Sequence, residues 1–230
     1  MTKRALTRAS IIGASVASLF LGVVGFIHAP TGHPILGALA RVARGGCPFG
    51  YDASKPADRQ RQRAKFALVH RGSERAKNRP ALGFVLDRTT RSELIAKLAT
   101  RGVSCASAKG LSDLTCNGVP SGALGGPPAP ARNLWLTFGT REQLLSVVAI
   151  SRDSSSTSIS GLFVATEREL DHDAGAASQT HGDPAAETLA RGALRQASSE
   201  FRFTNYYALA RATHLGSDFV FTEEYRSLPD

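Results

Sequence analysis

Apolar residues recur at helical spacing in the segment "TTRSELIAKLATRG". Leu94, Ile95 and Leu98 fall on one face, as they do in an amphipathic helix. Gly102 follows them and favours a helix C-terminus, because glycine readily adopts the left-handed conformation found there. The pattern therefore predicts a helix over 90–101.

Two other segments carry helix signals. Ahead of the first, Ser54 can cap a helix, Pro56 suits the first helical turn and Asp58 favours the positive end of a helix. These residues predict a helix over about 56–69. The second candidate is "ISGLFVATERELDHD", Ile159–Asp173.

Runs of aliphatic, aromatic and β-branched residues predict strands where turn residues bound them. Gly139-Thr140 and Gly216-Ser217 are interpreted as tight turns between neighbouring strands. Val119–Asn133 is rich in Gly and Pro, so we expect a long surface loop there. The expected strands are Ala81–Leu86, Asn133–Phe138, Gln143–Arg152, Ser198–Asn205, Tyr206–Gly216 and Asp218–Ser227.

The turn at Gly216-Ser217 fixes the register of the last hairpin. It sets each aromatic residue of one face against a residue of the preceding strand: Phe219 opposite His214, Phe221 opposite Ala212 and Tyr225 opposite Ala208. We expect these aromatic side chains to belong to the core, because large apolar side chains sharing one face of a strand are usually buried.

The expected elements occur twice in the same order, a helix followed by antiparallel strands. We therefore expect an α+β fold in which an N-terminal transmembrane helix precedes two small modules, each a helix packed on an antiparallel sheet. The expected divisions are a signal anchor or signal peptide at 1–30, a basic juxtamembrane segment with a helix at 31–80, a first module at 81–152 and a second at 153–230.

The order of elements in "TTRSELIAKLATRGVSC" and "LTFGTREQLLSVVAI" resembles known helix-plus-sheet modules. Such modules form the BamE/SmpA outer-membrane assembly lipoproteins and, in tandem, the β-lactamase inhibitor proteins. The resemblance covers about half of the chain and includes no diagnostic motif. The chain also lacks the lipobox cysteine of the lipoprotein members. The resemblance implies a protein-binding role without catalysis.

An uncharged apolar run, Ile11–Ile27, follows the cations Lys3, Arg4 and Arg8. It is short for a membrane span and long for the apolar part of a signal peptide. The cationic start should stay in the cytoplasm, so everything after residue 30 is expected to be exported. An uncleaved anchor in the inner membrane is favoured over a removed signal peptide, because neither candidate cleavage site is well placed. A buried helix of a cytosolic protein is disfavoured, since the run has no polar face.

Export changes how the cysteines are interpreted, because disulfides persist outside the cytosol. Cys105 and Cys116 lie on either side of the turn-like sequence "KGLS". A hairpin closed there sets them opposite each other, with Cα atoms about 4.5–5.5 Å apart, which suits a disulfide. We expect this bridge; the alternative is two buried thiols. Cys47 has no close partner in the sequence and is expected to be a reduced, buried thiol.

The formal charge of +9 is concentrated in the first third of the chain. Residues 55–79 hold nine Lys or Arg and two acids. Only one aromatic residue, Phe66, accompanies these cations, and an exported segment meets no nucleic acid, so nucleic-acid binding is not expected. Anionic lipid headgroups are the favoured contact, and a solvated helix face is the alternative. The candidate membrane-surface residues are Lys55, Arg59, Arg61, Arg63, Lys65 and Arg71.

Candidate chemistry is limited to one polar segment, "DHDAGAASQTHGD". Its histidines and carboxylates could bind a divalent metal, although their spacing matches no known site and a surface loop is favoured. The residues concerned are Asp171, His172, Asp173, His181 and Asp183. Glu223 and Glu224 are adjacent and would point to opposite faces of a strand, so they cannot act as a pair; a place at a strand edge is favoured, and the alternative is that one of them lies near the core.

These patterns predict an exported envelope protein that binds another protein of the envelope without catalysis. No cofactor is expected, because the chain has no phosphate-binding glycine loop, nucleophile elbow or haem-attachment motif. The alternative function is a metal-dependent envelope hydrolase that uses the segment Asp171–Asp183. A shallow, exposed sheet face would favour the binding protein, whereas a deep pocket over that segment would favour the enzyme.

Overall fold

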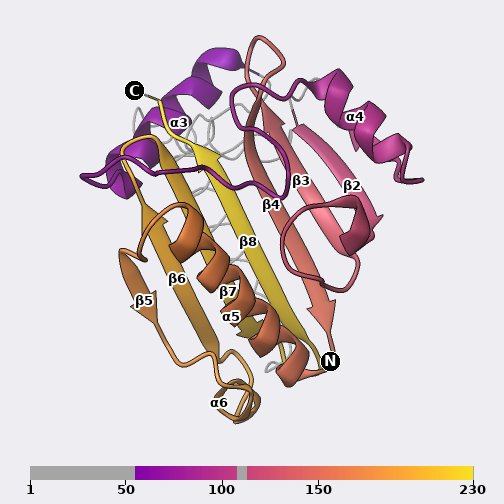
Figure 1. Cartoon of the computed structure of the whole chain (residues 1–230), viewed down its shortest axis with the longest axis vertical. Coiled ribbons are helices and arrows are strands. Elements are labelled where there is room, and N and C mark those ends of the chain that lie inside the picture. The colour runs from indigo at the N-terminus through magenta and orange to yellow at the C-terminus, as the bar shows by residue number, and fades with distance from the viewer. Residues whose placement is uncertain (1–54, 108–112, 230) are drawn as a thin grey trace, which may run out of the picture. The chain divides into compact units, whose positions relative to one another are not determined.

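A computed structural model describes residues 55–107 and 113–229. The chain divides into two compact units, 1–58 and 59–230, and the second contains every strand described below. These strands form one antiparallel eight-stranded sheet in the order β1-β2-β3-β4-β8-β7-β6-β5 (Figure 1). The strands are β1 Cys105–Ser107, β2 Asp113–Val119, β3 Arg132–Phe138, β4 Leu144–Asp153, β5 Gln179–His181, β6 Gln196–Arg202, β7 Tyr206–His214 and β8 Phe219–Ser227.

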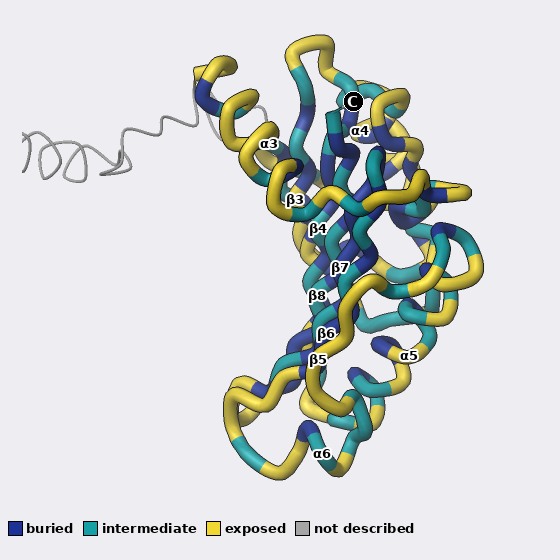
Figure 2. Tube along the Cα trace, turned by 90° about the vertical axis from the view of Figure 1, so that its left-hand side faces the viewer, coloured by how far each residue is buried: buried dark blue, intermediate teal, exposed yellow. Residues whose placement is uncertain are grey.

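Helices pack on both faces of the sheet, with α3 on one side and α5 on the other (Figure 2). We call the side covered by α5 the inner face and the opposite side the outer face. The helices are α3 Pro56–His70, α4 Arg91–Ala99, the short 3-10 helix η1 Ser121–Ala123, α5 Ser156–Asp173 and α6 Ala186–Ala190. The three helices expected from the sequence, α3, α4 and α5, are confirmed.

The prediction of two separate modules was wrong. Strand β4 of the first half pairs with β8 of the second over eight residues, from Ser146 opposite Arg226 to Asp153 opposite Phe219. The chain is therefore α+β with one continuous sheet. Local patterns identify strands but not which distant strands pair, and joining the halves removes two sheet edges that would otherwise be left unpaired.

The N-terminal transmembrane helix was part of the same prediction. Within residues 55–107 and 113–229, no helix is long and apolar enough to cross a membrane. The segment proposed for that role, Ile11–Ile27, lies outside the described residues, as does Cys47.

Local sequence signals are clearest at α4. Thr90 accepts a hydrogen bond from the Glu93 amide, and the Glu93 carboxylate accepts one from the Thr90 amide, which completes a capping box. Leu94 and Leu98 are fully buried. Ile95, expected on the same face, is 40% exposed. The buried stripe of α4 is therefore narrower than predicted, because the helix contacts the core only through residues spaced four apart.

The expected strand at Ala81–Leu86 is absent, and an irregular series of turns replaces it. Leu82 and Asp87 have positive φ angles of 55° and 65°, which no strand tolerates. The segment still buries Leu82, Phe84 and Leu86. Its apolar character is thus used to fill the core from a loop, and apolar content alone cannot distinguish such a loop from a strand.

The inner face holds most of the core. In the hairpin β7–β8 the predicted register is confirmed, with His214, Ala212 and Ala208 opposite Phe219, Phe221 and Tyr225. All three aromatic side chains are buried. The ring of Phe163 in α5 meets the ring of Phe221 edge to face at 6.4 Å between centroids. Small residues in β7 leave room for these rings, so that α5 packs closely on the sheet.

Candidate binding surface

The outer face carries a row of side chains that crosses the sheet from β2 to β8. Thr115 lies opposite Trp135, Trp135 opposite Val148, and Val148 opposite Glu224. Their neighbours along each strand, such as Leu134 and Ala149, are buried on the inner face. Because side chains alternate along a strand, this row points away from α5.

Trp135 stands out in this row because it is 55% exposed. It is the single tryptophan of the chain. Val148 and Ile150 beside it are half-buried, so an apolar patch continues from the indole along β4. A tryptophan has a large apolar surface that folding normally covers, and one left exposed on a strand is typical of a binding surface.

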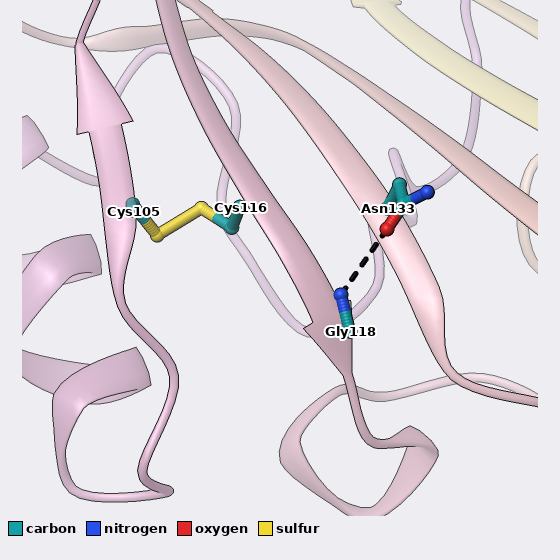
Figure 3. The surroundings of a disulfide bond; sticks show 4 residues. All are labelled: Cys105, Cys116, Gly118 and Asn133. Atoms are coloured by element: carbon teal, nitrogen blue, oxygen red, sulfur yellow. Dashed lines mark hydrogen bonds between the residues drawn. A yellow bond between two sulfur atoms is a disulfide. The ribbon is translucent and has the colours of Figure 1, made fainter.

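Strand β3 is held firmly beneath Trp135. It is paired on both sides, by β2 and by β4. Strand β2 is in turn bridged to β1 by a disulfide between Cys105 and Cys116, whose Cα atoms are 4.2 Å apart (Figure 3). The Asn133 side-chain oxygen accepts a hydrogen bond of 3.1 Å from the Gly118 amide, where the β2–β3 register shifts. The indole is thus presented by a braced part of the sheet.

The register predicted for the two cysteines is confirmed, because Cys105 is the residue opposite Cys116. Cys116 is fully buried on the inner face, and Cys105 packs against the same core. The bridge therefore ties the short edge strand β1 to the core side of β2 while Thr115, next to Cys116, faces outward with Trp135.

Helix α3 covers a different part of the outer face. Phe66 meets Tyr207 of β7 edge to face at 5.1 Å, and His70 lies 4.8 Å from the same ring. The guanidinium of Arg226 lies over the Phe66 ring. Burial lowers the pKa of His70, although Glu200 nearby opposes this effect. The packing side of α3 is therefore occupied by structural contacts.

These contacts involve two of the predicted membrane-surface residues. Arg63 donates hydrogen bonds to the carbonyl and the hydroxyl of Ser227, at 3.2 and 3.1 Å. Arg71 donates to the carbonyl of Pro229. Lys55 and Lys65 are exposed, and so is Arg61, whereas Arg59 is half-buried. The basic set is thus divided between residues that hold the C-terminal strand and residues on the surface.

The candidate metal ligands do not form a site in the structure. Among the residues described, no group of three or more His, Cys, Asp or Glu side chains is placed to hold a metal ion. His172 Nδ1 lies 2.8 Å from Oδ1 of its neighbour Asp173, while Asp183 accepts hydrogen bonds from Ala185 and Thr188 at the start of α6. The segment Asp171–Asp183, for which a surface loop was favoured, begins in the last turn of α5 and contains β5.

The nearest depression to this segment is small. It encloses about 200 Å³, below the usual range for ligand pockets. Arg202 in its wall is already held by Glu200, through hydrogen bonds of 2.9 and 2.6 Å to one carboxylate oxygen. This ion pair fixes the Arg202 side chain in the wall of the depression. Its other walls come from Ser73, Glu74, Arg75, Lys77, Ala174, Gly175, Ala176, Ser178 and Phe203.

A buried ion pair lies on the inner face, and sequence reasoning missed it. Arg132 Nε is 2.8 Å from Glu223 Oε1, with the two side chains 0% and 1% exposed. Tyr225 donates a hydrogen bond of 2.6 Å to the other carboxylate oxygen. Burial raises the pKa of Glu223, and Arg132 opposes that shift.

The expected strand-edge position of Glu223 was wrong, because β8 lies between β4 and β7 in the middle of the sheet. A pair with this little contact with solvent cannot meet a substrate, so its role is structural. Arg132 begins β3 although the sequence placed it within the predicted surface loop Val119–Asn133, and nothing in its sequence neighbourhood marks it as a buried residue.

Comparisons with known proteins give no relatives: no family model, curated protein or solved structure matches this chain.

Proposed function

We propose that this protein is a non-enzymatic binding protein of the cell envelope, and that it holds a protein partner against the outer face of its sheet around Trp135. The observation that carries the proposal is a 55% exposed tryptophan on a strand paired on both sides. Tryptophan is enriched among the residues that dominate binding energy at protein interfaces.

The neighbourhood of Trp135 supports this role. Val148 and Ile150 extend the apolar surface, and Thr115 and Thr222 are half-buried hydroxyl residues at its margins. An apolar centre with a polar rim is the usual composition of a protein–protein interface. A braced sheet also loses little conformational freedom on binding, which favours affinity.

Export is part of the same proposal. The Cys105–Cys116 bridge fits an oxidising compartment, where disulfides persist. The cations ahead of Ile11–Ile27 favour transfer of the following chain. A reporter active only outside the cytoplasm, fused after Asp230, should therefore be active, and activity of a cytoplasm-only reporter at the same place would contradict export.

Site-specific photocrosslinking in intact envelopes tests the binding role. A photoreactive phenylalanine analogue at position 135 should crosslink one defined protein. Leu194 is 78% exposed and does not belong to the outer face. The same analogue at this position is therefore the control and should not crosslink that protein. Equal products from both positions, or none from 135, would count against the surface.

Affinity for the captured protein gives the second measurement. Trp135→Ala should weaken binding about thirty-fold, the effect of a typical hot-spot residue, while Trp135→Phe should retain part of the affinity. Bound partner should also protect the single tryptophan from quenching by acrylamide. Unchanged affinity in Trp135→Ala would place the interface elsewhere.

A further inference from the structure

We infer that the side of α3 facing away from the sheet binds an anionic phospholipid surface. This role is separate from the protein-binding role of Trp135 and does not depend on it. It also does not use the behaviour of Ile11–Ile27, because the argument rests on the side chains of α3 alone.

The helix has two distinct sides. Arg63, Phe66, Ala67 and His70 are spaced to lie together, and they contact Ser227, Tyr207 and Leu209 through the hydrogen bonds, ring contacts and core cluster of the outer face. This side is structural and unavailable to a ligand.

The opposite side combines cations with exposed aliphatic residues. Arg61, Lys65, Leu68 and Val69 are spaced by three and four residues, so they form one stripe. Leu68 is 84% exposed, the highest value among the large apolar side chains of the described residues, and Val69 is 69% exposed. The single acid within the helix, Asp58, lies three residues before Arg61, but it is buried and so is not exposed beside Lys65, Leu68 and Val69.

This order of residues fits a lipid surface. Lys and Arg on a surface helix lie level with lipid phosphates, and aliphatic side chains beside them enter the boundary with the acyl chains. Long cationic side chains reach back to the headgroups while their stems stay in apolar surroundings. An acidic protein patch would attract Lys65 but would leave Leu68 and Val69 in contact with water. The combined stripe therefore favours lipid over an acidic protein.

The charge of the surrounding segment agrees with this assignment. Residues 55–79 carry nine cations against two acids, and each cation near an anionic membrane strengthens association about five-fold. Arg63 and Arg71 donate hydrogen bonds to the C-terminal residues Ser227 and Pro229. They therefore add to the positive electrostatic potential around the helix but do not contact lipid headgroups themselves. The exposed side chains of Lys65, Leu68 and Val69 are in position to contact lipid.

Fluorescence quenching in the full chain tests the inference. Leu68→Trp adds a second tryptophan to Trp135, and wild type supplies the baseline signal of Trp135 alone. With vesicles that contain phosphatidylglycerol and lipids brominated on the acyl chains, the added emission should fall about two-fold or more, because the side chain lies within the bromine layer. Leu194→Trp is the matched control: it is similarly exposed, lies outside α3 and should not be quenched.

Lipid charge and protein charge provide the decisive comparisons. Neutral phosphatidylcholine vesicles should give little quenching of the tryptophan at position 68, even where other parts of the chain associate with them. Lys65→Glu should lower the lipid affinity of this face about thirty-fold, whereas Arg168→Glu, on the exposed side of α5, should not. Quenching that is equal in neutral and anionic vesicles, insensitive to Lys65→Glu, or equal at position 194 would overturn the inference, as would no quenching at position 68.

Discussion

The buried pair of Arg132 and Glu223 allows a sharp prediction about stability. Glu223→Ala leaves the guanidinium of Arg132 fully buried, where Nη2 donates a hydrogen bond of 3.1 Å to the Pro127 carbonyl. Removing one partner of a buried ion pair costs about 3–5 kcal/mol of unfolding free energy. The cross-strand neighbours of Glu223, Ala149 and Ala210, carry no group that can replace the lost carboxylate, and Glu169 of α5, which interacts electrostatically with Arg132, offsets only part of the loss. We therefore expect a loss of about 4 kcal/mol.

Two companion variants separate charge from volume. Glu223→Gln keeps the shape and one acceptor for Arg132, and should cost about 1–3 kcal/mol. The double variant Arg132→Met with Glu223→Leu removes both charges together. Because the desolvation penalty of both groups then disappears, it should be far less destabilised than Glu223→Ala.

Urea unfolding of the full chain, followed by the emission of Trp135, provides the assay. The indole lies on the outer face and Glu223 on the inner face, so the substitutions do not touch the reporter. Urea leaves the ion pair unscreened, unlike guanidinium chloride. A cost below about 1 kcal/mol for Glu223→Ala would refute the reasoning, since it would mean that Arg132 is still satisfied or solvated.

Three further predictions concern the bridge, a helix cap and pH. Replacing Cys105 and Cys116 by alanine should lower the unfolding free energy by about 3 kcal/mol, from the entropy of a loop of this length, and urea midpoints of oxidised wild type and variant measure it. Thr90→Ala removes the hydroxyl that accepts a hydrogen bond from the Glu93 amide and should cost about 1 kcal/mol, whereas Thr90→Ser should be neutral in the same titration. Burial first, and Asp173 second, raise the pKa of Glu169 in the folded state, so folding favours its protonated form; the stability from this group is present at low pH and is lost as pH rises through the raised pKa. Glu169→Gln should therefore flatten the fall in urea midpoint just above the normal carboxyl range, and an unchanged pH profile would contradict this.

Local elements were predictable because their signals lie within a few residues. The hairpin at Gly216-Ser217 has a two-residue turn, and its length fixes which residues face each other. The pairing of Cys105 with Cys116 follows in the same way, from counting residues outward on either side of the turn-like sequence between them. The capping residues of α4 likewise precede the apolar stripe that they support.

The remainder depends on contacts between distant parts of the chain. Pairing of β4 with β8 joins segments about seventy residues apart, and periodicity carries no information about such a partner. The burial of Glu223 follows from that pairing, since it places β8 inside the sheet. Trp135 was recognised as a strand residue, but its exposure depends on how far α3 extends over the outer face. The binding surface could therefore be found only from the assembled sheet.

The position of β8 has a consequence for the order in which the protein can be assembled. Strands β1 to β4 and strands β5 to β7 each end in an open edge until residues 219–227 arrive between them. Among the described strands, β8 is synthesised last. The complete sheet therefore cannot form while the earlier strands are emerging from the ribosome. Long-range pairing of this kind also forms slowly. Removal of β8 alone should consequently leave two aggregation-prone halves in place of a slightly smaller domain.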